Sequence, residues 1–287
     1  MLLSLDRTAR REALRRFLEE DVGLGDITTL ALVSADQKAI GHFVAKMPLV
    51  VAGVPLAIET LTILDGGLVA EVWHGDGEYL SEGGRLAGVR GNARALLSGE
   101  RVATNLLQRL SGVATLTKRF VDAVHGTDAR ILDTRKTTPG LRAFEKYAVT
   151  LGGGVNHRLG LDHAVLIKDN HVKIAGSIRA AIEAARSANS HTQQCEVEVT
   201  NLEELQEALA CDVDAVLLDN MAPELVRKAV KLIRAQRTGR EIVIEASGGM
   251  TVENVREFAE AGVDRISVGA LTHSAPAIDV SFEIEPS

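Results

Sequence analysis

The residues with the clearest capacity for chemistry lie between positions 133 and 171, where cationic side chains surround three consecutive glycines. The stretch from 130 to 171 carries seven lysines and arginines against four acids, whereas the whole chain has a net charge of −7. A concentrated positive charge attracts an anionic ligand whatever the net charge of the protein. The stretch therefore predicts a site for a small polyanion. Its cationic and histidine residues are Arg135, Lys136, Arg142, Lys146, His157, Arg158, Lys168 and His171.

Two acidic residues, Glu198 and Asp219, end apolar stretches that are typical of strands. Glu196 and Glu198 alternate with apolar residues, so both point to the same face of a strand. That face would be solvated on an open sheet, whereas in a barrel it would point inward. Inward carboxylates would repel a polyanion unless Mg²⁺ mediates or positive charge develops on the substrate. The pattern therefore indicates chemistry through a positively charged sugar carbon.

Glycine-bearing turns follow the last two strand-like stretches, at Ser247-Gly248-Gly249 and at Gly269-Ala270. Backbone N–H groups at such turns bind phosphate, and the late strands of a barrel are their usual place. The alternative is a plain turn between a strand and a helix. We favour phosphate binding because both late turns carry glycine.

The triple glycine at 152–154 and Lys168 also have two interpretations each. One glycine would suffice to end a helix, but three beside the polar triplet at 156–158 favour a loop that faces a ligand. Lys168 ends an apolar strand, where it could form a Schiff base or bind an anion. A lone buried lysine without a partner would be costly.

These residues need a scaffold, and the sequence after position 129 alternates between strand-like and helix-like stretches. Such alternation predicts a parallel sheet with helical crossovers, either open or closed into a barrel. Polar residues and glycines fall at the carboxyl ends of the strands, which favours a barrel. Six strands are fewer than the eight of a full barrel, so an incomplete barrel is also allowed. The expected strands are 129–133, 163–168, 195–199, 215–219, 241–246 and 265–269, and the expected helices are 139–150, 175–188, 201–210, 222–235 and 251–261.

The first third of the chain has a different texture. Residues 8–20 and 97–124 are predicted as helices. Between them, residues 38–95 alternate short strands with glycine turns, which is typical of an antiparallel β-rich domain. The chain is therefore expected to contain two domains of different class.

The composition excludes several functional classes. With 46% hydrophobic and 25% charged residues the chain is an ordinary globular protein, while its acidic balance and 3% aromatic content argue against nucleic-acid binding. Cys195 and Cys211 are expected to be free thiols, with a single disulfide as the alternative. The N-terminus lacks the apolar core of a signal peptide and no stretch approaches the length of a membrane span, so a cytoplasmic location is expected.

Several motifs carry a family resemblance. The most specific are Asp133-Thr134-Arg135-Lys136-Thr137-Thr138-Pro139-Gly140, Glu145-Lys146-Tyr147-Ala148-Val149, Gly152-Gly153-Gly154-Val155-Asn156-His157-Arg158-Leu159-Gly160 and Leu166-Ile167-Lys168-Asp169-Asn170-His171. They resemble quinolinate phosphoribosyltransferase, and the resemblance covers essentially the whole chain. It implies an α/β protein with an N-terminal open-faced β-sandwich (α+β) domain over residues 1–110 and an incomplete, seven-stranded α/β barrel over 111–276. Residues 277–287 would return to the N-terminal domain.

The resemblance also implies a reaction and its site. Quinolinate and phosphoribosyl pyrophosphate would give nicotinate mononucleotide, pyrophosphate and CO₂ with Mg²⁺, as a step of de novo NAD biosynthesis. Lys136, Lys168, Glu198 and Asp219 are the implied catalytic residues, and the two acids would hold Mg²⁺ in part through the substrate. Quinolinate would be held by Arg135, His157, Arg158 and Lys168, with Arg101 from the other subunit of a homodimer. Lys136 would face the phosphoribosyl substrate, and Thr134 is a further implied substrate-binding residue. The 5′-phosphate would be bound at Ser247, Gly248, Gly249, Val268, Gly269 and Ala270.

One position departs from the family pattern, and three other functions compete. Lys46 stands where many members carry an arginine, so a contact of this residue with pyrophosphate stays open, as do the roles of Asp169 and His171.

The molybdenum-transport-associated paralogue shares the fold, but the intact motif at 156–158 argues against it. A Schiff-base aldolase using Lys168 would leave the arginines without a dicarboxylate. A non-catalytic anion-binding regulator would not need inward acids.

Overall fold

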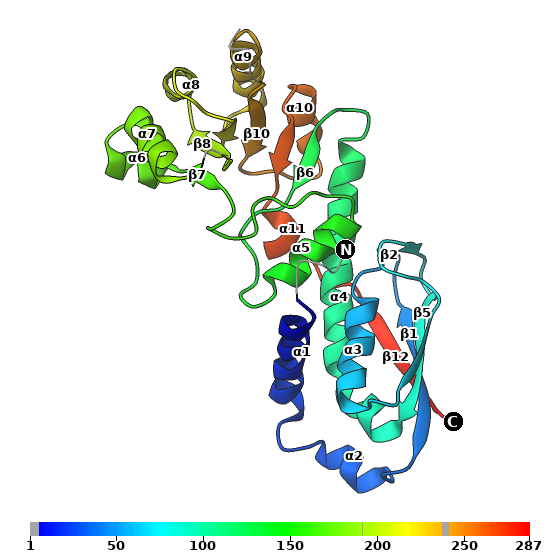
Figure 1. The fold of residues 1–287 in the computed structure, drawn as a ribbon. Coiled ribbons are helices and arrows are strands. Elements are labelled where there is room, and N and C mark those ends of the chain that lie inside the picture. The colour runs from blue at the N-terminus through cyan, green and yellow to red at the C-terminus, as the bar shows by residue number, and fades with distance from the viewer. Residues whose placement is uncertain (1–5, 191, 237–240) are drawn as a thin grey trace. The chain divides into compact units, whose positions relative to one another are not determined.

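The computed structural model describes residues 6–190, 192–236 and 241–287 of the chain. The chain divides into two compact units, which Figure 1 shows as ribbons. The first unit contains Met1–Lys118, Thr137–Gly153 and Ser274–Ser287, and the second contains Arg119–Lys136 and Gly154–His273. The last segment, Ser274–Ser287, falls in the first unit, in line with the expected return of residues 277–287. Thr137–Gly153 was expected in the barrel but also falls in the first unit.

The first unit is built on an antiparallel sheet in the order β12-β1-β5-β3. Its last strand comes from the end of the chain and pairs with β1, with Phe282 opposite Phe43. Apolar residues on one face of the sheet pack with residues of α3 and α4 in a single buried core. The bounds are β1 (Lys38–Ala45), β3 (Val69–Val72), β5 (Arg85–Asn92), β12 (Val280–Pro286), α3 (Val54–Leu64) and α4 (Ala93–Ala123).

The expected N-terminal sheet domain is confirmed, but the sequence missed α3 inside the region assigned to strands and turns. This helix is largely apolar, so it shows no clean helical stripe. Its start is fixed by Asp76, whose carboxylate Oδ1 accepts from the backbone N–H groups of Gly53 and Val54, both at 2.9 Å. The remaining elements of this unit are α1 (Arg7–Val22), α2 (Ile27–Leu32), α5 (Arg142–Leu151), β2 (Leu49–Val50) and β4 (Tyr79–Leu80).

The second unit contains a parallel six-stranded sheet in the order β6-β11-β10-β9-β8-β7. An isolated parallel bridge joins Leu132 of β6 to Val155, so a seventh parallel segment lies beyond β6. In the described part of the chain β7 pairs only with β8, which leaves the sheet open there, as an incomplete barrel requires. The strands are β6 (Arg130–Leu132), β7 (Val165–Ile167), β8 (Cys195–Val199), β9 (Ala215–Asp219), β10 (Val243–Ser247) and β11 (Arg265–Ser267).

All six predicted strands of this unit are present, and the α/β class is confirmed. Their apolar runs are buried, as the complete burial of Val197, Val216 and Ile244 on neighbouring strands shows. The sequence missed two short helices, Asp169–Ala175 and Ala270–His273, because residues 169–171 were assigned to a polar motif and Ala270 to a glycine-bearing turn. The helices are α6 (Asp169–Ala175), α7 (Ile178–Ala188), α8 (Leu202–Leu209), α9 (Pro223–Arg234), α10 (Val255–Glu260) and α11 (Ala270–His273).

Two further expectations are addressed by the structure. Cys195 and Cys211 are both free thiols, as predicted. Among the described residues, no helix has the length and apolar character needed to cross a membrane.

Candidate active site

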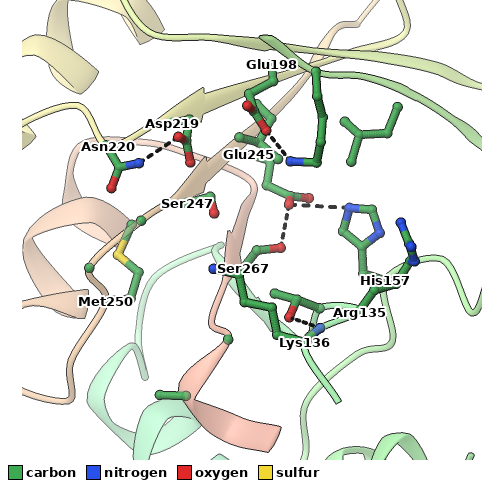
Figure 2. A pocket seen from close by; sticks show the side chains of 18 of the residues that line it. Arg135, Lys136, His157, Glu198, Asp219, Asn220, Glu245, Ser247, Met250 and Ser267 are labelled. Carbon is green, nitrogen blue, oxygen red and sulfur yellow. Dashed lines mark hydrogen bonds and ion pairs between the residues drawn. The ribbon is translucent and has the colours of Figure 1, made fainter. Parts of the chain in front are cut away.

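The carboxyl ends of the parallel strands surround a cavity of about 610 Å³. Glu198, Asp219, Ser247 and Ser267 lie at or near the ends of β8, β9, β10 and β11 and line it, and Figure 2 shows all four from close by. This rim is where barrel enzymes carry their sites. The expected site residues that line the cavity are Thr134, Arg135, Lys136, His157, Arg158, Lys168, Glu198, Asp219, Ser247, Gly248, Gly249, Gly269 and Ala270.

The structure does not bring every expected residue to this cavity. Val268 is buried behind the wall, and its backbone N–H donates to Leu132 O at 2.9 Å. Arg101 lies on α4 in the first unit with 61% of its side chain exposed, which leaves its guanidinium accessible to another chain. Lys46 also belongs to the first unit, where its ammonium donates to Glu283 at 2.8 Å.

Asp169 and His171 have structural contacts at the start of α6. The carboxylate of Asp169 accepts from the ammonium of Lys173, one turn along the helix, at 2.8 Å. The Nδ1 atom of His171 accepts from the backbone N–H of Lys168 at 2.9 Å. Both contacts secure the first turn of α6, immediately after the lysine that lines the cavity.

Lys168 and Glu198 form an ion pair across the ends of β7 and β8. The glutamate side chain is only 9% exposed, while the lysine side chain is 44% exposed. The pair therefore sets a cation and an anion side by side on one wall. A lysine engaged by a carboxylate is a poor candidate for Schiff-base formation, which needs the neutral amine.

The loop that carries His157 is held by Asp133, which is fully buried at the end of β6. One carboxylate oxygen of Asp133 accepts from the side-chain amide of Asn156 at 2.6 Å, and the other accepts from the backbone N–H of His157 at 2.9 Å. The triple glycine leads into this loop, and Gly153 has a φ of 87°, which favours glycine. Asp133 therefore positions the polar triplet at the cavity.

Beneath this loop lies a cluster of buried ionisable groups that the sequence did not reveal as such. The Nε2 atom of His157 lies 3.4 Å from Glu196 Oε2. It also lies 3.5 Å from Glu245 Oε1, and Ser267 donates to the same Glu245 oxygen (Figure 2). The backbone N–H of Arg158 donates to His157 Nδ1 at 2.7 Å, which assigns the ring proton to Nε2, facing the two acids.

Glu245 is the most perturbed acid of the cluster. Burial first, and then the neighbouring charge of Glu196, raise its pKa to about 7, while His157 and the hydrogen bond from Ser267 oppose the shift. One oxygen each of Glu196 and Glu245 is buried without a hydrogen-bond partner. Within the described residues, these three side chains also form the group whose ligand atoms lie close enough to hold a metal, within 4.8 Å of one another.

Two arginines, Arg135 and Arg158, give the part of the cavity wall that they line its positive charge; this part is called the arginine wall below. The pKa of Arg158 is lowered by burial first and then by the positive charge of Arg135. Because two guanidinium groups repel each other in a partly buried site, an anion with two negative groups would relieve that repulsion. The cavity thus suits a dicarboxylate on this side. The other lining residues, which were not among the expected site residues, are Leu166, Leu217, Asn220, Glu245, Met250, Ser267 and His273.

Comparison with known proteins places these features in a family. The family model described as quinolinate phosphoribosyl transferase, C-terminal domain, matches residues 113–283, and that of the N-terminal domain matches residues 26–111. The chain belongs to the quinolinate phosphoribosyltransferase family. The resemblance seen in the sequence motifs is thereby confirmed.

Individual relatives of this family match over nearly their full length. The nicotinate-nucleotide pyrophosphorylase [carboxylating] of Mycobacterium leprae is 44% identical over 287 residues, covering 99% of this chain and all of the relative. A probable enzyme of the same name from Synechocystis is 44% identical over 94% of this chain and 91% of its own length. Among solved structures, NadC from Streptococcus pyogenes has a TM-score of 0.93 at 37% identity, with 99% of both chains covered.

Proposed function

We propose that this chain transfers the phosphoribosyl group of phosphoribosyl pyrophosphate to quinolinate, with loss of CO₂, to give nicotinate mononucleotide and pyrophosphate in de novo NAD biosynthesis. The relatives that span the chain are named for this carboxylating pyrophosphorylase activity. The observation in the structure that carries the proposal is the pairing of a two-arginine wall with two rim acids in one cavity.

The arginine wall selects the pyridine substrate. Arg135 and Arg158 engage the two carboxylates of quinolinate, because the guanidinium fork matches a carboxylate in two parallel hydrogen bonds. His157 and Lys168 also line the cavity, and Thr134 shapes the turn before Lys136 by accepting from the backbone N–H of Lys136 at 3.0 Å. Arg101 of a second subunit completes this site in a homodimer.

The acidic rim promotes the transfer. Glu198 and Asp219 stabilise the positive charge that develops on the ribosyl carbon as pyrophosphate departs. Lys136 faces the phosphoribosyl substrate, and the turns that contain Gly248, Gly249 and Gly269 offer backbone N–H groups to the 5′-phosphate. The positive pyridinium nitrogen formed by the transfer then stabilises the electron pair that departing CO₂ leaves on the adjacent ring carbon, and that pair takes up a proton to form the C–H bond.

Magnesium belongs to the same proposal, and the donors on the acidic rim fit it. Mg²⁺ prefers oxygen ligands and is held by one or two carboxylates together with substrate phosphates. Glu198 and Asp219 supply such carboxylates. One oxygen of Glu198 accepts a hydrogen bond from the ammonium of Lys168, and one oxygen of Asp219 accepts from the side-chain amide of Asn220. When bound, the ion neutralises charge on the leaving pyrophosphate.

A cytoplasmic location completes the proposal. Reducing compartments keep thiols such as Cys195 and Cys211 free.

A direct assay tests the function. The purified chain with Mg²⁺ and phosphoribosyl pyrophosphate is expected to turn over quinolinate and to leave nicotinate unused, because the arginine wall requires the second carboxylate. Formation of nicotinate mononucleotide is followed by chromatography. Turnover of nicotinate without turnover of quinolinate would contradict the proposal.

A further inference from the structure

Asn220 has an unusual backbone conformation at the rim of the cavity. Its φ is 53°, and it is the one non-glycine residue in the described part of the chain with a positive φ. This conformation is unfavourable for a side-chain-bearing residue, although asparagine tolerates it better than most. Asn220 is exposed, so burial of its side chain in the core does not account for the conformation. Strain of this kind at a site points to a functional demand.

Two hydrogen bonds hold Asn220 in place. Its backbone N–H donates to Ser247 O at 2.9 Å, which joins the end of β9 to the end of β10. Its side-chain Nδ2 donates to Asp219 Oδ2 at 2.6 Å (Figure 2). A hydrogen bond to a carboxylate is stronger than one between neutral groups. The amide therefore fixes the direction in which the Asp219 carboxylate faces.

The glycine turn after β10 fits closely against the same residue. A Cβ atom on Gly248 would lie 2.2 Å from Asn220 Oδ1 and 2.5 Å from its Cγ. Gly248 also has a φ of 99°, so a side chain there would be both strained and blocked. Asn220 thus contacts the rim acid on one side and the turn proposed for the 5′-phosphate on the other.

We propose that Asn220 is a positioning residue that orients Asp219 and the glycine turn together, so that the acid faces the ribosyl carbon while the turn holds the 5′-phosphate. This inference rests on the proposed function and adds a residue to its machinery. Asn220 acts on the phosphoribosyl substrate and not on quinolinate, because its contacts are with the acid and the turn and not with the arginine wall.

Three substitutions separate the amide from the backbone conformation. Asn220→Gly keeps the positive φ without strain but removes the amide, Asn220→Ala removes the amide and adds strain, and Asn220→Asp sets a carboxylate against Asp219. All three are expected to lower kcat/KM for phosphoribosyl pyrophosphate by roughly tenfold or more, as for a lost hydrogen bond to a charged group. The KM for quinolinate is expected to change by no more than about twofold.

Asn201 provides a matched control. It follows β8 of the same sheet, but its side-chain oxygen accepts from the backbone N–H of Glu204 at 2.8 Å and caps α8. Asn201→Ala is expected to keep kcat/KM within about twofold of wild type. Thermal unfolding midpoints for every variant separate loss of function from loss of fold.

The possible results distinguish failure of the role proposed for Asn220 from failure of the proposed reaction with quinolinate. Wild-type kinetics in Asn220→Gly, with loss only in Asn220→Ala, would show that the backbone conformation matters and the amide does not, which overturns the inference. An equal loss for both substrates, in step with a lowered unfolding midpoint, would overturn it as well. A wild-type chain without turnover of quinolinate would instead contradict the proposed function.

Discussion

Glu245 shows how a single residue gains its chemistry from its surroundings. Its carboxyl group is completely buried, beside Glu196, His157 and the hydroxyl of Ser267. Burial and the second acid raise its pKa to about 7 from an ordinary 4.5. The folded chain therefore holds a proton on this carboxyl in a pH range where the unfolded chain has released it.

That proton makes stability depend on pH. Because the folded-state pKa is raised, the contribution of Glu245 is fully present below about pH 4.5 and is lost as pH rises towards 7. Between these values the loss is on the order of 1 kcal/mol per pH unit. Glu245→Gln, which cannot titrate, is expected to remove this slope, as measured by urea unfolding at pH 5, 6 and 7.

An exposed glutamate serves as the control for this measurement. The pKa of Glu283 is lowered by its hydrogen bond to Lys46, so its titration falls below the tested range. Glu283→Gln should therefore differ from wild type by the same amount at all three pH values. A pH-independent difference between Glu245→Gln and wild type would refute the raised pKa.

At the scale of elements, the sequence predicts the strands and helices that have a regular apolar pattern and end at a polar residue or glycine. The strands of the second unit are recognisable because each is an apolar run followed by a polar residue or glycine, as β9 before Asp219 is. The helix α3 was missed because its apolar residues are spread around its circumference and do not form a single stripe. The contacts of Glu245 and the φ of Asn220 depend on how neighbouring strands pair, with Glu245 opposite Leu217 and Arg265, and no local pattern encodes that register.

The start of α3 gives a prediction at this scale. Tyr147 of α5 is buried, and its hydroxyl donates to Asp76 Oδ2 at 2.8 Å, beside the oxygen that caps α3. Burial raises the pKa of Asp76, while the tyrosine and the two backbone N–H groups oppose that shift. Tyr147→Phe leaves a buried carboxylate oxygen without this donor, so the free energy of unfolding is expected to fall by about 1–2 kcal/mol.

The second tyrosine of the chain is a natural control. Tyr79 is 68% exposed, so Tyr79→Phe should change the free energy of unfolding by less than about 0.5 kcal/mol. Both variants are compared by urea denaturation. Equal stability of the two variants would show that the Asp76–Tyr147 hydrogen bond does not contribute to the first unit.

At the scale of the whole molecule, the proposed homodimer makes a claim about which chain supplies which residue. The cavity of the second unit contains Glu198 and Asp219, whereas Arg101 lies exposed on α4 of the first unit. If Arg101 serves the cavity of a partner, substitutions of Arg101 and of Glu198 damage different sites in a mixed dimer. One site of that dimer then carries both changes and the other carries neither.

Mixing inactive Arg101→Ala and Glu198→Ala chains is therefore expected to restore up to about one quarter of wild-type activity after random subunit exchange. A mixture of Glu198→Ala and Asp219→Ala chains should show no rescue, because both residues belong to the cavity of one chain. Activity is measured after exchange has been verified with differently tagged chains. No rescue by the first pair despite exchange would contradict a shared site.

The most direct test of the proposed reaction uses quinolinate labelled in the carboxyl group next to the ring nitrogen. With phosphoribosyl pyrophosphate and Mg²⁺, we expect labelled CO₂, pyrophosphate and nicotinate mononucleotide in equal amounts, and no labelled CO₂ when phosphoribosyl pyrophosphate is withheld. Equal release is expected because the electron pair that CO₂ leaves on the ring carbon is stabilised by the positive pyridinium nitrogen, which only ribosyl transfer creates. Labelled CO₂ released without phosphoribosyl pyrophosphate, or pyrophosphate released without CO₂, would contradict the account.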